Sequence, residues 1–569
     1  MSRRGSAVRR RGRALAVLAL ACALLAGCVS LPRSGPVTAS EPDLPAQQGI
    51  GLYAQGPQEG ANPREIVEGF LTASAAGYSD EFLVAREFMA GPAVETWQPL
   101  EQVRIYSDTD TPEFTRTADG AVRLTVAGQA SIDSAGHYTE SVPETTVEAD
   151  FTLARNPEGE WRIIELDDGV LLSAAFFDSL YAPSPLYFLT PDLTAVVPDL
   201  RWFPRQNQAT ALVRSLLEGP SAWLAPGVVT LVPAGTRMVV ESVLVQDGVA
   251  RVDLSADALA ADPSQRALLL AQVELTLRGV PGVQEVELTA AGAPYEVPES
   301  EPELPAYPYT AAPLVGVADG VLVDVVGGEA VPRPGSDRMA GADPRHPAVG
   351  YATAAPPTVY LDGPDRLTTA PTAEEPGVVL AQGQALVPPS VDRRDWVWTG
   401  PTRATGTLLA VHVGGEAADV DASWLNGATV RALRVSREGA RAVVVWEQAG
   451  AVQVDVAVVV RSRDGTPTAL VEPVRLGERL TDATDVAWVD EQTVAVLGTS
   501  GNDTSPAVHL LPVGGPTRRL PSVDGATSLT AGRGDRSVVL GTESGRLYER
   551  NGASWRPVEA GVRYPALPG

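Results

Sequence analysis

Cys28 is the residue of this chain whose type and surroundings predict the most specific chemistry. It follows Leu25, Ala26 and Gly27, and a leucine, a small residue and a glycine before a cysteine form the cleavage box of bacterial lipoproteins. In that chemistry the thiol receives diacylglycerol through a thioether, and cleavage before the cysteine frees an amine that takes a further acyl chain. Several acyl chains hold a protein on a membrane more firmly than one does. We therefore predict covalent diacylglycerol and N-acyl lipid on Cys28.

The residues before Cys28 have the order of a secretory signal peptide. Six arginines precede a short apolar run from Ala14 to Leu25, and this run is shorter than the roughly 20 apolar residues that a membrane span needs. We predict a signal peptide at residues 1–27 and a mature chain that is lipid-anchored on the extracytoplasmic face of the cell membrane. An ordinary signal peptide in which Cys28 is incidental stays open. Since the second cysteine, Cys22, lies within the signal peptide, the mature chain keeps no thiol for a disulfide, a nucleophile or a zinc site.

Other residue types that carry catalysis are scarce. The four histidines lie far apart and show no metal-ligand spacing: His137, His346, His412 and His509. The nearest approach to a Gly-x-Ser-x-Gly nucleophile motif, Gly498-Thr499-Ser500-Gly501, has the wrong spacing. Lysine is absent, which excludes a P-loop or a Schiff base. We predict no catalytic residue, no metal site and no enzyme activity, although the sequence leaves open two carboxylates that meet across a cleft, as glycoside hydrolysis requires.

The charge of the chain limits its partners. Its formal net charge is −26, and loss of the arginines of the signal peptide makes the mature part more acidic still. Such a surface is repelled by nucleic acid and by anionic lipid head groups. We therefore expect no nucleic acid partner, and contact with the membrane through the lipid anchor.

Local patterns predict a tether and then an α+β domain. The tether, residues 28–61, is rich in Pro, Gly, Ser and acidic residues. Asn62-Pro63-Arg64-Glu65 places a cap, a proline and an acidic residue where they favour a helix start. A second helix is expected from Asp80, and four alternating strand patterns follow. This order predicts an α+β domain at residues 62–205, similar to NTF2-like or cystatin-like folds, whose sheet encloses either a ligand pocket or its own core.

A second α+β domain is predicted at residues 206–297. Asp247-Gly248 is a strong hairpin signal, and Asp262-Pro263-Ser264-Gln265 has the pattern of a helix start. The strands expected in this domain are residues 228–232, 238–245, 249–254 and 283–288.

Beyond a Pro- and Glu-rich linker at residues 298–308, the sequence changes to short β patterns with Gly, Pro and Asp turns. One pattern, a strand, a turn and an apolar second strand, recurs about every 40 to 50 residues. Its copies begin at Ala352, Ser390, Ser436, Trp488 and Ala531. That period is typical of propeller blades, so residues 309–569 are predicted to form a β-propeller of about five or six blades.

Tryptophans and arginines of this propeller are the candidate binding residues. The tryptophans form either blade cores or part of a binding face, where Trp and Arg are favoured: Trp396, Trp398, Trp424, Trp446, Trp488 and Trp555. Arg393, Arg394 and Asp395, in the turn before Trp396, are the candidate rim of such a face.

The second α+β domain carries a specific resemblance. The segments that carry it are Glu218-Gly219-Pro220, Val232-Pro233-Ala234-Gly235-Thr236 and Asp247-Gly248-Val249-Ala250-Arg251-Val252-Asp253-Leu254-Ser255. They resemble the GerMN domain of sporulation and germination proteins. With the cysteine box, Trp202-Phe203-Pro204 and the β-rich tail, the mature chain resembles the LpqB family of actinobacterial lipoproteins. The resemblance implies a GerMN domain at residues 206–297 and a C-terminal propeller, and that family has no catalytic motif to transfer.

The resemblance implies a function and leaves two others open. LpqB-like proteins are associated with the sensor histidine kinase MtrB of the MtrAB two-component system, whose extracytoplasmic part they contact in cell-wall homeostasis and division. We therefore expect a non-enzymatic membrane-anchored lipoprotein that binds such a kinase and modulates its signalling by favouring one of its states. The alternatives are a protein that binds or hydrolyses cell-wall glycans through the propeller, and a carrier of a lipid or other small ligand in the first domain.

Overall fold

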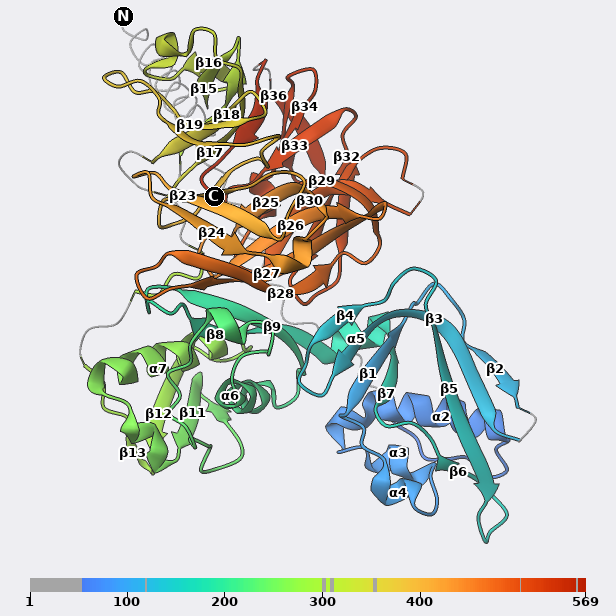
Figure 1. Ribbon diagram of the computed structural model, residues 1–569. Coiled ribbons are helices and arrows are strands. Elements are labelled where there is room, and N and C mark those ends of the chain that lie inside the picture. The colour runs from blue at the N-terminus through green and yellow to red at the C-terminus, as the bar shows by residue number, and fades with distance from the viewer. Residues whose placement is uncertain are drawn as a thin grey trace, which may run out of the picture. The chain divides into compact units, whose positions relative to one another are not determined.

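The structure is a computed structural model that describes residues 54–117, 120–298, 303–307, 312–351, 356–501, 503–558 and 561–569. The predicted signal peptide, Cys28 and most of the predicted tether lie outside these residues. The described chain has an N-terminal α+β region with a curled sheet, a second α+β domain and a C-terminal series of β-sheets (Figure 1). The predicted multidomain fold class is confirmed at this level. The likeness of the first domain to NTF2-like or cystatin-like folds stays a prediction.

In the N-terminal domain a curled sheet covers one long helix (Figure 1). The strand order is β6-β5-β3-β1-β7, and β2 and β4 pair with β3. Helix α2 (Pro63–Ala76) begins as predicted, because Asn62 and Glu65 form a reciprocal capping box. Its residues Ile66, Val67 and Phe70 are buried in the core of the domain. The remaining elements are α3 (Leu83–Glu87), α4 (Ala93–Thr96), α5 (Ala174–Leu180), β1 (Gln102–Tyr106), β2 (Glu113–Arg116), β3 (Val122–Asp133), β4 (Tyr138–Glu140), β5 (Thr146–Arg155), β6 (Trp161–Glu165) and β7 (Val170–Ser173).

A two-stranded ribbon connects this domain to the next. Its strands β8 (Tyr181–Leu189) and β9 (Val196–Pro204) pair with each other along their whole length and belong to no larger sheet in the described chain. Tyr181 and Trp202 pack in the core of the N-terminal domain, whereas Leu186, Phe188 and Val197 pack in the core of the second domain. Both domains therefore share the ribbon, and the boundary predicted at residue 205 falls at its end.

The second domain combines two helices with a small mixed sheet. The sheet has the order β10-β11-β12-β13, and β11 and β12 run parallel because helix α7 crosses between them. Helix α7 begins at the predicted capping box of Asp262 and Gln265. The elements are α6 (Gln208–Glu218), α7 (Pro263–Leu277), β10 (Leu244–Gln246), β11 (Val249–Leu254), β12 (Glu285–Ala290) and β13 (Ala293–Pro294).

Two of the strands predicted in this domain are wrong. Residues 228–232 contribute one isolated bridge, between Leu189 and Val229. Residues 238–245 contribute a bridge at Met238 and, at their end, the first residues of the short strand β10. The apolar residues of this second segment predicted a strand, but β10 lies at the edge of the sheet and most of these side chains are exposed: Val239, Val240, Leu244 and Val245.

The C-terminal domain consists of small antiparallel sheets. Among the described residues it has four four-stranded sheets and one eight-stranded sheet, which divides into β21 to β24 and β25 to β28 because a single pair, Asp421 with Ala469, joins the halves. The strands are β14 (Leu314–Ala318), β15 (Val321–Val326), β16 (Glu329–Pro332), β17 (Pro344–Val349), β18 (Thr358–Asp362), β19 (Arg366–Thr369), β20 (Val379–Gln382), β21 (Ser390–Val391), β22 (Trp396–Thr399), β23 (Thr407–His412), β24 (Ala417–Asp421), β25 (Thr429–Val435), β26 (Arg441–Gln448), β27 (Ala451–Arg461), β28 (Pro467–Leu476), β29 (Leu480–Trp488), β30 (Thr493–Ser500), β31 (Ala507–Pro512), β32 (Arg518–Ser522), β33 (Ala526–Thr530), β34 (Val539–Thr542), β35 (Leu547–Asn551), β36 (Ser554–Val558) and β37 (Arg563–Ala566).

These strands make six four-stranded units in the described part of the chain. The five predicted repeats fall on the second strand of five units: β18, β22, β26, β30 and β34. The remaining unit has the order β16-β15-β14-β37, so the two ends of the domain close it together. A repeat along the sequence could not predict this unit, because its fourth strand, β37, comes from the opposite end of the domain.

Closure of this unit depends on the absence of a side chain at Gly316 in β14. A Cβ at Gly316 would lie 2.2 Å from Cγ1 of Val562 and 3.1 Å from the carbonyl oxygen of Arg563. Overpacking costs about 1 to 3 kcal/mol, so we expect Gly316→Val to lower the thermal unfolding midpoint and to speed hydrogen exchange in β37. The control is Gly279→Ala, where a Cβ meets open space. Unchanged exchange in β37 of the Gly316→Val protein would contradict this account of closure.

Candidate functional site

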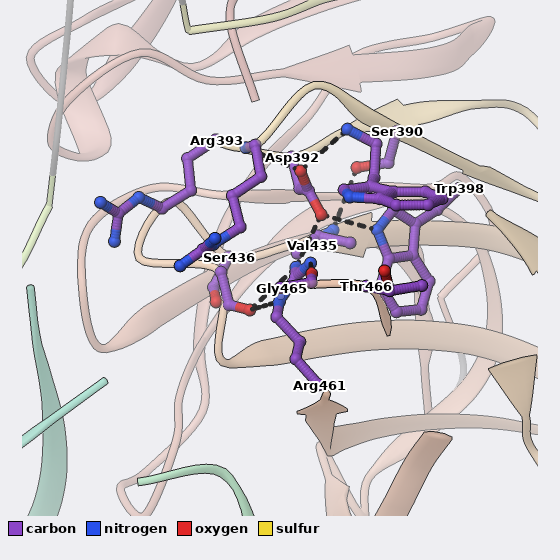
Figure 2. Close-up of polar contacts among 12 residues, drawn as sticks. Ser390, Asp392, Arg393, Trp398, Val435, Ser436, Arg461, Gly465 and Thr466 are labelled. Atoms are coloured by element: carbon purple, nitrogen blue, oxygen red, sulfur yellow. Dashed lines mark hydrogen bonds and ion pairs between the residues drawn. The ribbon is translucent and has the colours of Figure 1, made fainter. Parts of the chain in front are cut away.

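A buried carboxylate, Asp392, fixes the turn that carries the predicted rim (Figure 2). Its Oδ1 accepts hydrogen bonds from the backbone N–H groups of Arg394 and Trp396, at 2.8 and 3.1 Å. Its Oδ2 accepts from Nε1 of Trp398 at 3.0 Å and from the guanidinium of Arg461 at 2.6 Å. Because a buried carboxylate must be paired and hydrogen-bonded, this turn has little freedom to move.

The rim arginines contact the loop between β8 and β9. Arg394 forms an ion pair with Asp192, and Arg393 donates to Oγ1 of Thr194 at 2.8 Å. We call this contact the arginine joint. The predicted rim is therefore occupied by another part of the same chain. Asp395, the third predicted rim residue, makes no hydrogen bond or ion pair to this loop in the described part of the chain; burial raises the pKa of its carboxyl, while His412 acts in the opposite direction.

Asp192 is the centre of the arginine joint. Burial alone would raise its pKa, but hydrogen bonds from Thr190 and Thr194 and the charges of Arg393 and Arg394 outweigh it and lower the pKa to about 2. The carboxylate is therefore ionised throughout the neutral range, and the joint is a charged contact.

A cavity of about 230 Å³ adjoins the arginine joint. Four of its lining residues are arginines: Arg393, Arg394, Arg461 and Arg463. Arg463 is exposed and makes no hydrogen bond or ion pair with any described residue. A group of guanidinium ions favours binding of an anion. Asp192 already pairs with Arg393 and Arg394, so the anion at this cavity is a side chain of the same protein.

A second joint brings together three residues that resemble a hydrolase triad. In the hairpin of β3 and β4, Oδ2 of Asp133 lies 2.8 Å from Nδ1 of His137, and Nε2 of His137 lies 2.7 Å from Oγ of Ser221. We call this contact the histidine joint. The order carboxylate, imidazole, hydroxyl matches the catalytic arrangement of serine hydrolases.

Ser221 is nevertheless a poor nucleophile in this setting. Its hydroxyl lies 2.7 Å from both carboxylate oxygens of Asp199, and its N–H donates to the same group at 2.9 Å. Ser221 is only 4% exposed, and Asp199 is paired with buried Arg201. A negative charge forming beside Asp199 would be repelled rather than stabilised. The histidine joint therefore holds the N-terminal domain against the second domain and lacks the features of a catalytic site.

A third joint connects the ribbon and the first domain to the propeller sheets. Nε1 of Trp202 donates to the carbonyl of Gly514 at 2.8 Å, and Oγ1 of Thr517 donates to Glu140 at 2.7 Å. Arg479 lies 3.8 Å from the same carboxylate. We call this contact the tryptophan joint.

The other predicted site residues are placed as follows. Leu25, Ala26, Gly27 and Cys28 lie outside the described residues. Four of the propeller tryptophans are buried in the sheets, as blade core requires: Trp396, Trp398, Trp446 and Trp488. Burial lowers the pKa of His346 to about 4, and His509 is 1% exposed. Among the described residues no group of three or more His, Cys, Asp or Glu could hold a metal ion, and no helix there has the length and apolar character of a membrane span.

The histidine joint was not predicted from the sequence. His137 and Ser221 are 84 positions apart, and no spacing rule connects them. The one available signal was that Ser221 directly follows Glu218-Gly219-Pro220, the segment that carries the family resemblance.

The fold and joints define a class: a multidomain protein built from an α+β domain, a GerMN-type domain and a C-terminal propeller, held together by contacts between the modules. Three family models match in the same order. The LpqB N-terminal domain matches residues 56–178, the domain described as sporulation and spore germination matches 185–296, and the LpqB β-propeller domain matches 320–568.

Curated relatives match over nearly the whole chain. Lipoprotein LpqB of Cutibacterium acnes is 28% identical and covers 97% of this chain and 98% of its own, and that of Streptomyces avermitilis is 26% identical over 100% of both. Among solved structures, TolB from Acinetobacter baumannii has a TM-score of 0.34 at 14% identity, covering 45% of this chain and 65% of its own. The chain belongs to the LpqB lipoprotein family.

The arginine joint predicts a pH dependence. Because the folded pKa of Asp192 lies below the ordinary 3.8, its contribution to stability is present above about pH 4 and is lost as the pH falls through about 2. We expect Asp192→Asn to destabilise the protein by about 1 to 2 kcal/mol at pH 7, with a difference in unfolding midpoint that shrinks below about pH 4. Exposed Asp110→Asn is the control. A difference that stays constant down to pH 3 would show that the joint is not ionic.

The histidine joint predicts inertness toward serine reagents. We expect a fluorophosphonate probe to leave Ser221 unlabelled, because the hydroxyl is buried and bound to Asp199. Ser221→Ala should instead destabilise the protein by about 1 to 3 kcal/mol, since a buried carboxylate loses a donor, and should speed hydrogen exchange at residues 133–138. Labelling that mass spectrometry assigns to Ser221 would overturn the structural role.

Proposed function

We propose that this chain is a non-enzymatic lipoprotein, anchored through Cys28 to the outer face of the cytoplasmic membrane, that binds the extracytoplasmic part of an MtrB-like sensor histidine kinase. By binding one state of the kinase more tightly it modulates two-component signalling in cell-wall homeostasis and division. A ligand shifts an equilibrium only by its difference in affinity for the two states.

The observation that carries this proposal is the set of three joints. The arginine, histidine and tryptophan joints each hold side chains of one module against another, and most of their partners are buried or half-buried. Modules held in this way present their surfaces in a fixed relation. A preorganised surface loses less freedom on binding and so discriminates better between two shapes of a partner.

Family membership and chemistry support the same reading. The reported relatives are named as lipoproteins, and their names describe no enzyme activity. The group of Asp133, His137 and Ser221, which resembles a catalytic triad, is better explained as the histidine joint. Binding to a partner in the same membrane also raises the effective concentration, so a modest interface suffices.

Binding or hydrolysis of cell-wall glycans through the propeller, the alternative reading, has less support. Sugar recognition needs exposed aromatic faces. Trp396, Trp398 and Trp488 are at most 5% exposed, and Trp446 donates its Nε1 hydrogen to Asp455 inside a sheet.

The test is reconstitution of the kinase with this protein in one membrane. In proteoliposomes that hold the full-length kinase of the same organism, we expect the lipidated chain to change the rate of autophosphorylation several-fold. At the same total concentration the Cys28→Ala variant should have little effect, because it does not share the membrane of the kinase. It should reach the effect of the lipidated chain only at a much higher concentration. Fatty-acid labelling confirms that the variant lacks lipid. An unchanged rate, with no binding of the purified outer domain to the lipidated chain, would refute the proposal.

A further inference from the structure

A cavity of about 630 Å³ lies between the N-terminal domain and the second domain. This is the size of a ligand or peptide site. One wall is the turn between α2 and α3 together with the start of the curled sheet, the opposite wall is helix α6, and the β8–β9 ribbon contributes Tyr181, Trp202 and Phe203 between them. Asp133 of the histidine joint and Trp202 of the tryptophan joint also line this cavity.

The wall from the N-terminal domain and the ribbon is rich in aromatic side chains, and its two tyrosines are uncharged. The hydroxyls of Tyr78 and Tyr181 lie 2.8 Å apart and satisfy each other. Burial raises the pKa of both tyrosines, that of Tyr181 to about 12, so neither carries charge at neutral pH. Phe82 packs its ring edge-on against Tyr78, at 5.0 Å between centroids. This wall therefore offers ring faces and edges to an apolar group.

Helix α6 turns a stripe of small and polar side chains to the cavity. Thr210, Ala211, Arg214, Ser215 and Glu218 line it, with the three- and four-residue spacing of one helix face. The other face carries the buried leucines of the domain core. The stripe is free of large apolar residues, so an occupant can lie close to the helix.

The charges at the cavity select a cation. Glu81, Glu218 and Glu241 line it, are exposed, and make no ion pair with any described residue. Asp133, a fourth lining carboxylate, is occupied by His137. Arg214 is the one cationic residue in the lining. Three unpaired carboxylates against one guanidinium attract a basic group and repel an anionic lipid head group.

An apolar lip continues from the cavity along the segment that was wrongly predicted to be one strand. Glu241 and Ser242 line the cavity, and the residues on either side of them are apolar and unusually exposed: Val239 53%, Val240 58%, Leu244 57% and Val245 36%. The backbone N–H of Val243 donates to Oγ1 of Thr210 at 2.9 Å, which ties the lip to helix α6. Leu100, on the opposite side of the cavity, is 57% exposed.

The lip ends in a free strand edge. Strand β10 pairs on one side with β11 and is the outermost strand of its sheet in the described chain. All three of its residues are exposed. Such an edge can accept an extended peptide, whose backbone hydrogen-bonds to the strand while alternate side chains enter neighbouring pockets.

We propose that the cavity and the β10 edge together form a docking groove for an extended segment of a partner protein that carries apolar and basic side chains. The apolar side chains lie on the lip and against the aromatic wall, and a basic side chain reaches Glu218 and Glu241. This proposal rests on the proposed function, since it takes the outer domain of the sensor kinase as the partner. A small lipid in the cavity is the competing occupant.

The first test reverses the charge of the groove in the full lipidated chain. We expect Glu218→Arg combined with Glu241→Arg to weaken binding of the purified kinase outer domain at least tenfold, and wild-type binding to weaken with added salt. Glu285→Arg, an exposed charge reversal on β12 of the same domain, is the matched control and should change binding less than twofold. Equal affinity of both variants would overturn the groove while leaving the proposed function intact.

The second test locates the contact. A photo-cross-linking amino acid at Leu244 should capture the outer domain through a peptide that contains basic and apolar residues. The same group at Val378, an exposed propeller residue, should not. Equal cross-linking at both positions, or capture of an acidic segment, would contradict the groove.

A third test separates failure of the groove from failure of the proposed function. If the outer domain does not bind the wild-type chain, the proposed function falls, and the groove is tested with synthetic peptides of alternating Val and Arg or alternating Val and Glu. Preference for the Arg peptide, lost in the double variant, would support the groove, and no preference would overturn it. Lipid that co-purifies with the wild-type chain and protects Leu100 from labelling would show that the cavity holds a lipid instead.

Discussion

The β8–β9 ribbon is the element on which the arrangement of the modules depends. The loop of the ribbon carries Asp192, the anion of the arginine joint, and strand β9 carries Asp199 and Trp202 of the other two joints. Eight of the nine residues of β9 are buried although the ribbon belongs to no larger sheet in the described chain. A strand buried on both faces must pack against something on each side: Val197 and Phe203 lie in the core of the second domain, Trp202 lies in the core of the N-terminal domain, and Leu200 lies against Gly514 and Gly515 of the propeller sheets.

Buried charge makes the ribbon specific as well as stable. Asp199 and Arg201 alternate with the apolar residues of β9 and are 2% and 3% exposed. Their ion pair spans 2.9 Å, the hydroxyl of Ser221 donates to Asp199, and Arg201 donates to the carbonyl of Gly219. Separation of the second domain from the ribbon would leave this ion pair in place but would remove the hydrogen bonds that Ser221 and Gly219 make to its two buried charges, and an unsatisfied buried charge is costly. The second domain is therefore held in one register on the ribbon.

The sequence predicted those features of the fold that depend on neighbouring residues or on a repeat along the chain. The capping boxes at Asn62 and Asp262, the hairpin at Asp247-Gly248 and the period of the propeller repeat all act over a few residues or recur along the chain. The joints could not be predicted, because Asp192 and Arg394 are 202 positions apart and each is an ordinary charged residue in its own segment. The strand predicted at residues 238–245 failed for a related reason. A group of β-branched and other apolar residues favours a strand, but it does not show whether this chain supplies the surface that covers them.

The exposed apolar residues of the segment 238–245 are the ones that the proposed docking groove would use. Val239, Val240 and Leu244 are exposed beside a cavity whose carboxylates Glu218 and Glu241 make no ion pair with any described residue. Exposed apolar residues next to a free strand edge favour aggregation unless the edge is short or charged, and β10 is only three residues long. The shortness of this edge limits pairing between free molecules, and in the proposed groove its exposed apolar residues would contact a partner. Trp202 lines the same cavity and donates to Gly514 in the tryptophan joint, so a partner in the groove would touch the ribbon that holds the propeller in place.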